Sequence, residues 1–150
     1  IMELMDAACL AAVHRLLEWA QPGQPVPAAH VRAAAREFGL SLSQARGAAV
    51  LAERIRAGAG AWAWDAAAID WQGNEVTLTH GGAVLRIDRL VRRRGEGWWV
   101  LDYKSAGHPE RDDSLIAQLQ RYRDAVREAY PGDTVRAAFL TGQGELVELE

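Results

Sequence analysis

The chain contains little cysteine, little lysine and no long apolar run, and each shortage excludes a class of protein. Cys9 is the only cysteine among 150 residues, so neither an internal disulfide nor a four-cysteine zinc or iron–sulfur site can form. Every apolar run falls far short of the roughly 18 residues that a membrane-spanning helix needs. No basic segment precedes an apolar one, so no secretory signal is visible. We therefore expect a cytoplasmic protein that does not enter a membrane.

The composition is that of one ordinary globular domain. Hydrophobic residues make up 49% of the chain and charged residues 25%, and 150 residues are enough to bury a substantial core. From the length we expect residues 1–150 to form a single domain. Because the chain opens with Ile1 and Met2, we also expect it to be a fragment of a longer protein.

The basic residues are unusual in kind. The formal net charge is −3, which argues against a dedicated nucleic-acid binder, because such proteins usually carry a clearly basic surface. Of the 17 basic residues, 16 are arginine and only Lys104 is lysine. A guanidinium cannot replace an ammonium where a compact or deprotonatable amine is needed. Lys104 is therefore the basic residue that most strongly indicates a functional site.

The first part of the chain, up to about residue 60, has the apolar spacing of helices. Gly39 ends one predicted helix, and Ser41 or Ser43 is positioned to cap the next. The predicted helices cover residues 4–20, 28–38 and 42–57.

The second part, residues 61–150, changes to the alternating pattern of strands, with glycine-containing turns between them. Helical spacing returns once, over residues 114–130, and Pro131-Gly132 ends that helix. The pattern predicts an α/β fold with a mixed central sheet flanked by helices and an extra helical N-terminal segment. The predicted strands cover residues 75–79, 83–91, 98–103, 135–140 and 145–149.

One of these strands carries a polar patch. Asp102 and Lys104 are two positions apart, so their side chains leave the same face of the sheet. If the preceding turn is centred on Glu96, antiparallel pairing places Asp88 opposite Lys104. Asp88 and Asp102 brought close together repel each other unless a cation lies between them, and such oxygen ligands suit Mg²⁺ or Mn²⁺. The alternative is an exposed salt-bridge cluster that contributes little to stability.

These residues, in this order, resemble the PD-(D/E)XK nuclease superfamily. More specifically, the sequence around them looks like the RecB/AddA-type nuclease domain at the C-terminus of helicase–nucleases. The resemblance covers nearly the whole chain. It is carried by His14 on a helix, Asp88, the run Asp102-Tyr103-Lys104, and Gln118 and Tyr122 in Gln-x-x-x-Tyr spacing.

The resemblance implies a restriction-endonuclease-like fold and a magnesium-dependent deoxyribonuclease, with Mn²⁺ as the other candidate metal. It further implies an exonuclease in double-strand-break repair and recombination. Helicase domains of the same chain would deliver single-stranded DNA, and an AddB-like subunit is an implied partner. The cysteines that hold an iron–sulfur cluster in some relatives are absent from this sequence, so no such cluster is expected.

The resemblance also assigns roles to single residues. His14, Asp88 and Asp102 would be metal ligands, together with the backbone carbonyl of Tyr103. Lys104 would serve the attacking water. Gln118 and Tyr122 would support the site from the helix that follows. The implied catalytic residues are Asp88, Asp102, Lys104, Gln118 and Tyr122.

Some of these residues also have ordinary structural explanations. His14 lies among apolar residues and can be a core histidine, and Tyr122 has the helical spacing of a core residue. Arg89 and the run Arg92, Arg93 and Arg94 are candidates for contacts with DNA phosphates, although a short charged run is usually a solvated hairpin tip.

Trp98 and Trp99 point to opposite faces of their predicted strand, so we expect at most one of them in the core. The other is free to stack on bases or on a neighbouring domain.

The sequence leaves three functions open. The first is the nuclease domain of a helicase–nuclease, which the complete set of motif residues favours. The second is a catalytically degenerate nuclease fold that binds DNA or a partner protein. The third is a stand-alone restriction-like or repair nuclease.

Overall fold

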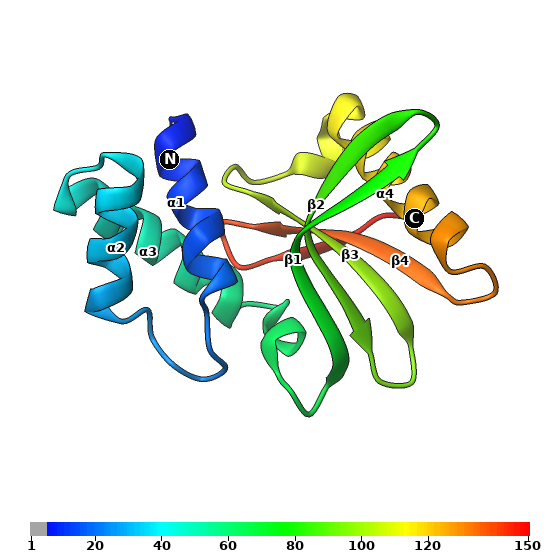
Figure 1. The fold of residues 1–150 in the computed structure, drawn as a ribbon, viewed down its shortest axis with the longest axis horizontal. Coiled ribbons are helices and arrows are strands. Elements are labelled where there is room, and N and C mark those ends of the chain that lie inside the picture. Colours follow the sequence, from blue (N-terminus) through cyan, green and yellow to red (C-terminus); the bar gives the residue numbers. More distant parts are fainter. Residues whose placement is uncertain (1–5) are drawn as a thin grey trace.

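The computed structural model describes residues 6–150, and Figure 1 shows them as a twisted sheet with helices on both faces. The strand order follows the chain, β1-β2-β3-β4-β5. Neighbouring strands are antiparallel except β3 and β4, which are parallel and joined through α4. The strands are β1 (Ile69–His80), β2 (Ala83–Arg93), β3 (Gly97–Lys104), β4 (Val135–Thr141) and β5 (Leu146–Glu148).

The helices begin and end at residues that suit those positions. The Asp6 side chain accepts the N–H of Cys9 at the start of α1, and Ser41 and Gln44 form a reciprocal capping box at the start of α3. Gly39 ends α2 in the left-handed conformation, with a φ of 64°. The helices are α1 (Ala7–Glu18), α2 (Ala28–Phe38), α3 (Leu42–Ala57) and α4 (Asp113–Ala129), with short 3₁₀ turns η1 (Ala61–Trp64) and η2 (Pro109–Arg111).

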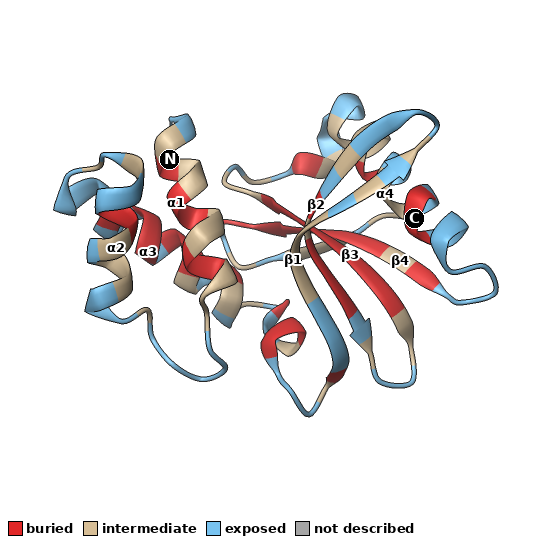
Figure 2. Ribbon diagram, viewed as in Figure 1, coloured by how far each residue is buried: buried red, intermediate tan, exposed pale blue. Residues whose placement is uncertain are grey.

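The core consists of two apolar clusters, one on each face of the sheet. Helices α1, α2 and α3 pack on one face, around side chains such as Leu16, Ile55 and Trp99. Helix α4 packs on the other face through Leu119 and Val126. Figure 2 shows the consequence: β3 and β4 are buried along most of their length, whereas the end of the β1–β2 hairpin is exposed.

The predicted α/β class, with a mixed sheet flanked by helices, is confirmed by this arrangement. Strand β1 begins at Ile69 rather than at residue 75, because Gly73 and Asn74 interrupt the alternation that a sequence pattern needs. The start of the first predicted helix at Leu4 lies outside the described residues. No helix within residues 6–150 is long and apolar enough to cross a membrane.

The expectation that at most one of Trp98 and Trp99 is in the core is wrong. Trp98 is 5% exposed and Trp99 is 3% exposed. Both are buried because helices cover both faces of the sheet, so opposite faces of β3 are equally shielded from water.

Candidate functional site

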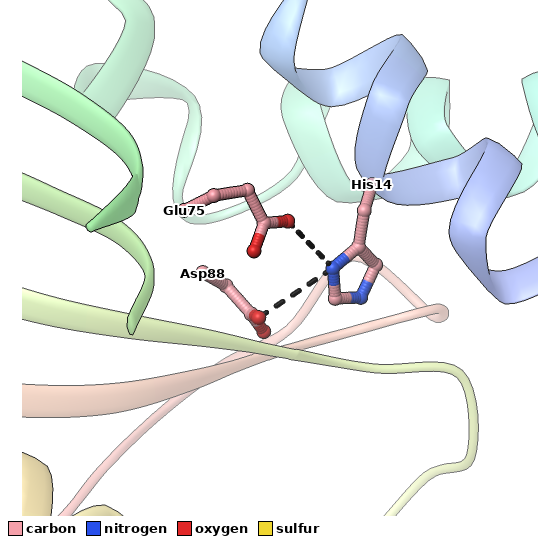
Figure 3. Close-up of side chains that lie close together, drawn as sticks. All are labelled: His14, Glu75 and Asp88. Atoms are coloured by element: carbon pink, nitrogen blue, oxygen red, sulfur yellow. Dashed lines mark hydrogen bonds and ion pairs between the residues drawn. The ribbon is translucent and has the colours of Figure 1, made fainter. Parts of the chain in front are cut away.

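A cluster of three polar side chains joins α1 to the β1–β2 hairpin (Figure 3). The Nδ1 atom of His14 lies 3.2 Å from Glu75 Oε1 and 3.5 Å from Asp88 Oδ1. One ligand atom from each residue falls within 4.8 Å of the other two. All three side chains are half-buried. An imidazole and two carboxylates at this separation can hold a divalent cation.

Glu75 was not predicted to belong to any site. It occupies the left-handed region with a φ of 50°, between the paired positions Asn74↔Arg89 and Val76↔Ile87. This irregularity in β1 places Glu75 beside His14, which is 61 positions earlier in the chain. The interrupted alternation around Gly73 was the available signal in the sequence, and it indicated only an irregular strand.

The irregular part of β1 is held by Arg89, whose side chain is 1% exposed. Its guanidinium donates to the Asn74 Oδ1 atom at 2.8 Å, the Gln72 Oε1 atom at 2.7 Å and the Ala63 carbonyl at 2.6 Å. It also lies 4.5 Å above the Trp64 ring. The expected contact of Arg89 with DNA phosphate is therefore not available, because alternation along β2 turns this side chain into the core.

Asp102 and Lys104 lie beside the cluster on β3. Lys104 Nζ is 2.9 Å from Asp102 Oδ2, and Asp102 is buried. The predicted pairing of Asp88 with Lys104 is wrong. The turn is centred on Gly95, since Arg93 pairs with Gly97, and the β2–β3 ladder ends at Arg89↔Leu101.

Continuing that register puts Asp88 opposite Asp102. The observed partner of Asp88 is two positions from the predicted one. Because side chains alternate with a period of two along a strand, Asp88 and Asp102 still lie on the same face of the sheet. The Asp88 Oδ2 atom accepts the backbone N–H of Tyr103 at 2.8 Å.

The electrostatics of Asp88 reflect these neighbours. Burial, followed by the charge of Asp102, raises the pKa of Asp88 to about 9, while the N–H of Tyr103 opposes the shift. Without a cation, the carboxyl is therefore protonated at neutral pH. A bound divalent cation favours the carboxylate instead and releases that proton.

The cluster opens into a cleft of about 570 Å³ between α1 and the hairpin. Its lining includes the three cluster residues, the apolar side chains of Leu10 and Phe38, and the guanidinium of Arg86. The Arg86 Nε atom lies 3.1 Å from Glu75 Oε2, and its side chain is 72% exposed. The cleft therefore combines three side chains of the types that ligate cations with an accessible positive charge suited to an anionic ligand.

The other predicted site residues lie at different distances from this cleft. Tyr122, on α4, is half-buried against the apolar cluster of that face, and burial, then Asp102 and Asp88, raises its pKa. Gln118 is half-buried one turn earlier on α4. The Tyr103 ring is buried on the face of the sheet that α1 to α3 cover, 5.3 Å from the His14 ring. The run Arg92 to Arg94 lies at the opposite end of β2, next to the β2–β3 turn.

A second polar surface lies on the N-terminal helices, away from the cluster. Helices α2 and α3 are joined by Gly39-Leu40-Ser41, a short glycine-containing turn of the kind found in helix-turn-helix motifs. The exposed side of α3 carries Arg46 and Arg54, and neither forms an ion pair with a carboxylate within residues 6–150. Residues 6–57 contain six arginines and four acidic residues, whereas residues 58–150 contain 11 basic and 15 acidic residues.

The same helical segment resembles a known family. Residues 6–57 match the family described as wHTH-Hsp90_Na associated, where wHTH denotes a winged helix-turn-helix. No curated protein matches the chain. The match covers α1, α2 and α3 and ends where α3 ends.

This match corrects the identity predicted from the motifs. The matching family is a winged helix-turn-helix family and not the PD-(D/E)XK nucleases, so the prediction of a RecB/AddA-type nuclease domain of a helicase–nuclease is wrong. The repair and recombination role, the helicase domains and the AddB-like subunit lose their support with it. The physical reason is that a hairpin with acidic residues near its paired ends can bring such a motif together in any fold. The helix that carries His14 belongs to the matched segment.

Proposed function

We propose that the chain is a DNA-binding module that contacts duplex DNA through α3. The observation that carries the proposal is the pair of arginines, Arg46 and Arg54, on the exposed side of the second helix of a helix-turn-helix pair. In such motifs the second helix lies in the major groove, and residues near its N-terminus contact base edges. The similarity of residues 6–57 to a winged helix-turn-helix family supports this use of the helices.

The exposed residues of α3 suit this role. Ser43, Arg46, Gly47, Val50 and Arg54 recur at helical spacing and form one stripe. A guanidinium binds phosphate or the acceptor edge of guanine with two hydrogen bonds, and Gly47 has no side chain to hold the helix away from the DNA. The excess of acidic residues lies in the other part of the chain, which would face away from the DNA.

A salt series tests the proposal. We expect the chain to bind a labelled duplex in fluorescence anisotropy with a shallow salt slope, equivalent to about two to four phosphates. Arg46→Ala and Arg54→Ala should each weaken binding and lower the slope by about one. Arg111→Ala removes an exposed arginine from η2 and serves as the matched control. If both α3 variants bind duplex DNA as tightly as the wild type, the proposed interface is wrong.

We also propose a divalent cation, Mg²⁺ or Mn²⁺, at the cluster of His14, Glu75 and Asp88. The observation that favours it is the convergence of three ligand atoms from α1, β1 and β2 within 4.8 Å. Burial and then the charges of Asp102 and Glu75 raise the pKa of Asp88, and a cation there would offset both the burial cost and the repulsion between the carboxylates. It would also offer positive charge to a phosphate group in the adjoining cleft.

Direct titration with Mn²⁺ tests the cation site. We expect His14→Ala and Glu75→Gln to weaken Mn²⁺ binding in calorimetry by about tenfold or more. Glu145→Gln removes an exposed carboxylate outside the cluster and should leave the affinity unchanged. Equal affinities for all variants would place the bound cation elsewhere. The restriction-endonuclease-like fold, a magnesium-dependent deoxyribonuclease activity and a cytoplasmic location stay predictions, and electrophoresis of DNA incubated with Mg²⁺ and the protein tests the activity.

A further inference from the structure

An aromatic row lies on the α4 face of the sheet, and neither proposed function uses it. We define the row as Trp71 on β1, Trp98 on β3 and Tyr130 at the end of α4. The rings of Trp71 and Trp98 meet edge to face at 5.5 Å, and those of Trp98 and Tyr130 stack at 4.3 Å. Trp98 is buried, whereas Trp71 is 44% exposed and Tyr130 is 38% exposed. The row therefore ends in two accessible rings.

Contacts within the chain restrict both exposed rings, and Tyr130 stacks on the buried Trp98. A Cβ atom at Gly73 would lie 2.7 Å from Cη2 of Trp71, so the indole occupies the space that the missing side chain leaves. The Trp98 Nε1 atom donates a hydrogen bond to Asp133 at 3.0 Å, which anchors the central ring. Rings held in position lose little conformational entropy when a planar ligand stacks on them.

Arginines flank the row. Arg92 on β2 is the cross-strand neighbour of both Trp71 and Trp98, and Arg127 is three positions before Tyr130 on α4. Their ion pairs with Asp70 and Asp124 are long, 3.7 Å and 3.8 Å. Long ion pairs between exposed side chains contribute little. The Arg127 Nη2 atom also donates to the Val135 carbonyl at 3.3 Å, and the remaining N–H donors of the two guanidinium groups can serve an anionic ligand.

We propose that the aromatic row binds single-stranded nucleic acid, with bases stacked on Trp71 and Tyr130 and phosphates beside Arg92 and Arg127. Aromatic faces interleaved with positive charge are the usual elements of such sites, and stacking there tolerates any base sequence. Tryptophan, tyrosine and arginine are also common at protein interfaces, so a chain that does not bind oligothymidylate would indicate a protein partner at this row instead.

This site is independent of the proposed duplex contact. Helices α1 to α3 cover one face of the sheet and α4 covers the other (Figure 1). Variants of the aromatic row and variants of α3 therefore act on different surfaces. A failure of one proposal is distinguishable from a failure of the other.

Binding of a labelled oligothymidylate in fluorescence anisotropy tests the inference. We expect Trp71→Ala and Tyr130→Ala each to weaken binding about tenfold, while binding to duplex DNA stays unchanged. Gly73→Ala keeps both rings but displaces the Trp71 indole, so it should also weaken binding. Val84→Ala, which trims a 72%-exposed apolar side chain elsewhere, is the matched control.

Two further results decide the outcome. An abasic strand of the same length keeps the phosphates and loses the bases, and we expect it to bind about tenfold more weakly than oligothymidylate. Equal binding of the two strands, or no binding of either by the full chain, would overturn the inference. So would variants of Trp71 and Tyr130 that bind as tightly as Val84→Ala. Circular dichroism identifies any variant that fails to fold, and Tyr130→Ala then provides the test by itself.

Discussion

Asp88 is the residue whose chemistry depends most on what surrounds it. Burial and the charges of Asp102 and Glu75 raise its pKa to about 9 in the folded chain, whereas an aspartate in an unfolded chain has a pKa near 3.9. Between these two values, the folded state holds a proton that the unfolded state has lost. The free energy of unfolding therefore falls as the pH rises through this interval, and the stabilisation is complete only below about pH 4.

Asp88→Asn should remove this pH dependence, because the amide cannot ionise while its oxygen can still accept the Tyr103 N–H. In urea unfolding with a chelator present, we expect the variant to exceed the wild type at pH 8 by on the order of 1 kcal/mol or more. The difference should shrink at pH 5. A difference that is constant between pH 5 and pH 8 would show that Asp88 ionises normally in the folded protein.

Arg89 is a buried cation whose hydrogen-bond partners are neutral carbonyl and amide oxygens. Arg89→Met fills much of the space but leaves the acceptors on Ala63, Gln72 and Asn74 without a donor. We expect a loss of about 2–4 kcal/mol in the free energy of unfolding measured by urea. Arg92 is exposed and lies three residues after Arg89 on β2. Arg92→Met should therefore change the free energy of unfolding by no more than about 0.5 kcal/mol. Similar losses for both would mean that Arg89 is not a structural centre of the site.

At the scale of single elements, two glycines of the helix pair should respond to the same substitution with opposite signs. Gly39 has a φ of 64°, so an alanine there is strained, and Gly39→Ala should lose about 1 kcal/mol. Gly47 lies within α3, and Gly47→Ala should gain about 0.5–1 kcal/mol. A Cβ atom at either position meets nothing within 4 Å, so steric contact does not confuse the comparison. Thermal or urea unfolding measures both, and equal signs would contradict the assigned end of α2.

The helices and most strands were predictable because their signals are local. Gly39 and the capping box at Ser41 mark the boundary between α2 and α3 in the sequence itself. The position of Glu75 was not predictable, because it depends on an irregular backbone and on the approach of α1 from a distant part of the chain. The observed register of β2 with β3 differs from the predicted one because the turn is centred on Gly95 instead of Glu96. This change moves the partner of every β2 residue by two positions along β3.

The resemblance of the N-terminal helices to a known family was the least predictable finding. Asp88, Asp102 and Lys104 do lie near one another in space, but this proximity follows from one hairpin and does not identify a family. The N-terminal helices contain information that isolated motif residues lack, because the whole segment 6–57 matches a winged helix-turn-helix family. The boundary near Gly58, where α3 ends, was visible in the sequence as a change of pattern.

At the scale of the whole molecule, the candidate cation site joins two layers. His14 belongs to the helical layer that includes α3, whereas Glu75 and Asp88 belong to the sheet. A cation bound by all three would connect the proposed duplex-binding helices to the rest of the chain. Because such a cation binds the folded state only, it stabilises the protein by an amount that depends on its concentration.

Thermal unfolding with and without Mn²⁺ measures this connection. At a free concentration about 100 times the dissociation constant, the cation should add about 2.7 kcal/mol, which raises the Tm of a chain of this size by roughly 5–10 °C. His14→Ala and Glu75→Gln should lose most of the increase, and the exposed-site control Glu145→Gln should keep it. At one fixed Mn²⁺ concentration, the increase should be larger at pH 8 than at pH 6, because the cation must displace the proton of Asp88 and therefore binds more weakly at the lower pH. An equal increase in all four proteins would mean that Mn²⁺ acts at another place and that His14 does not join the two layers through a cation.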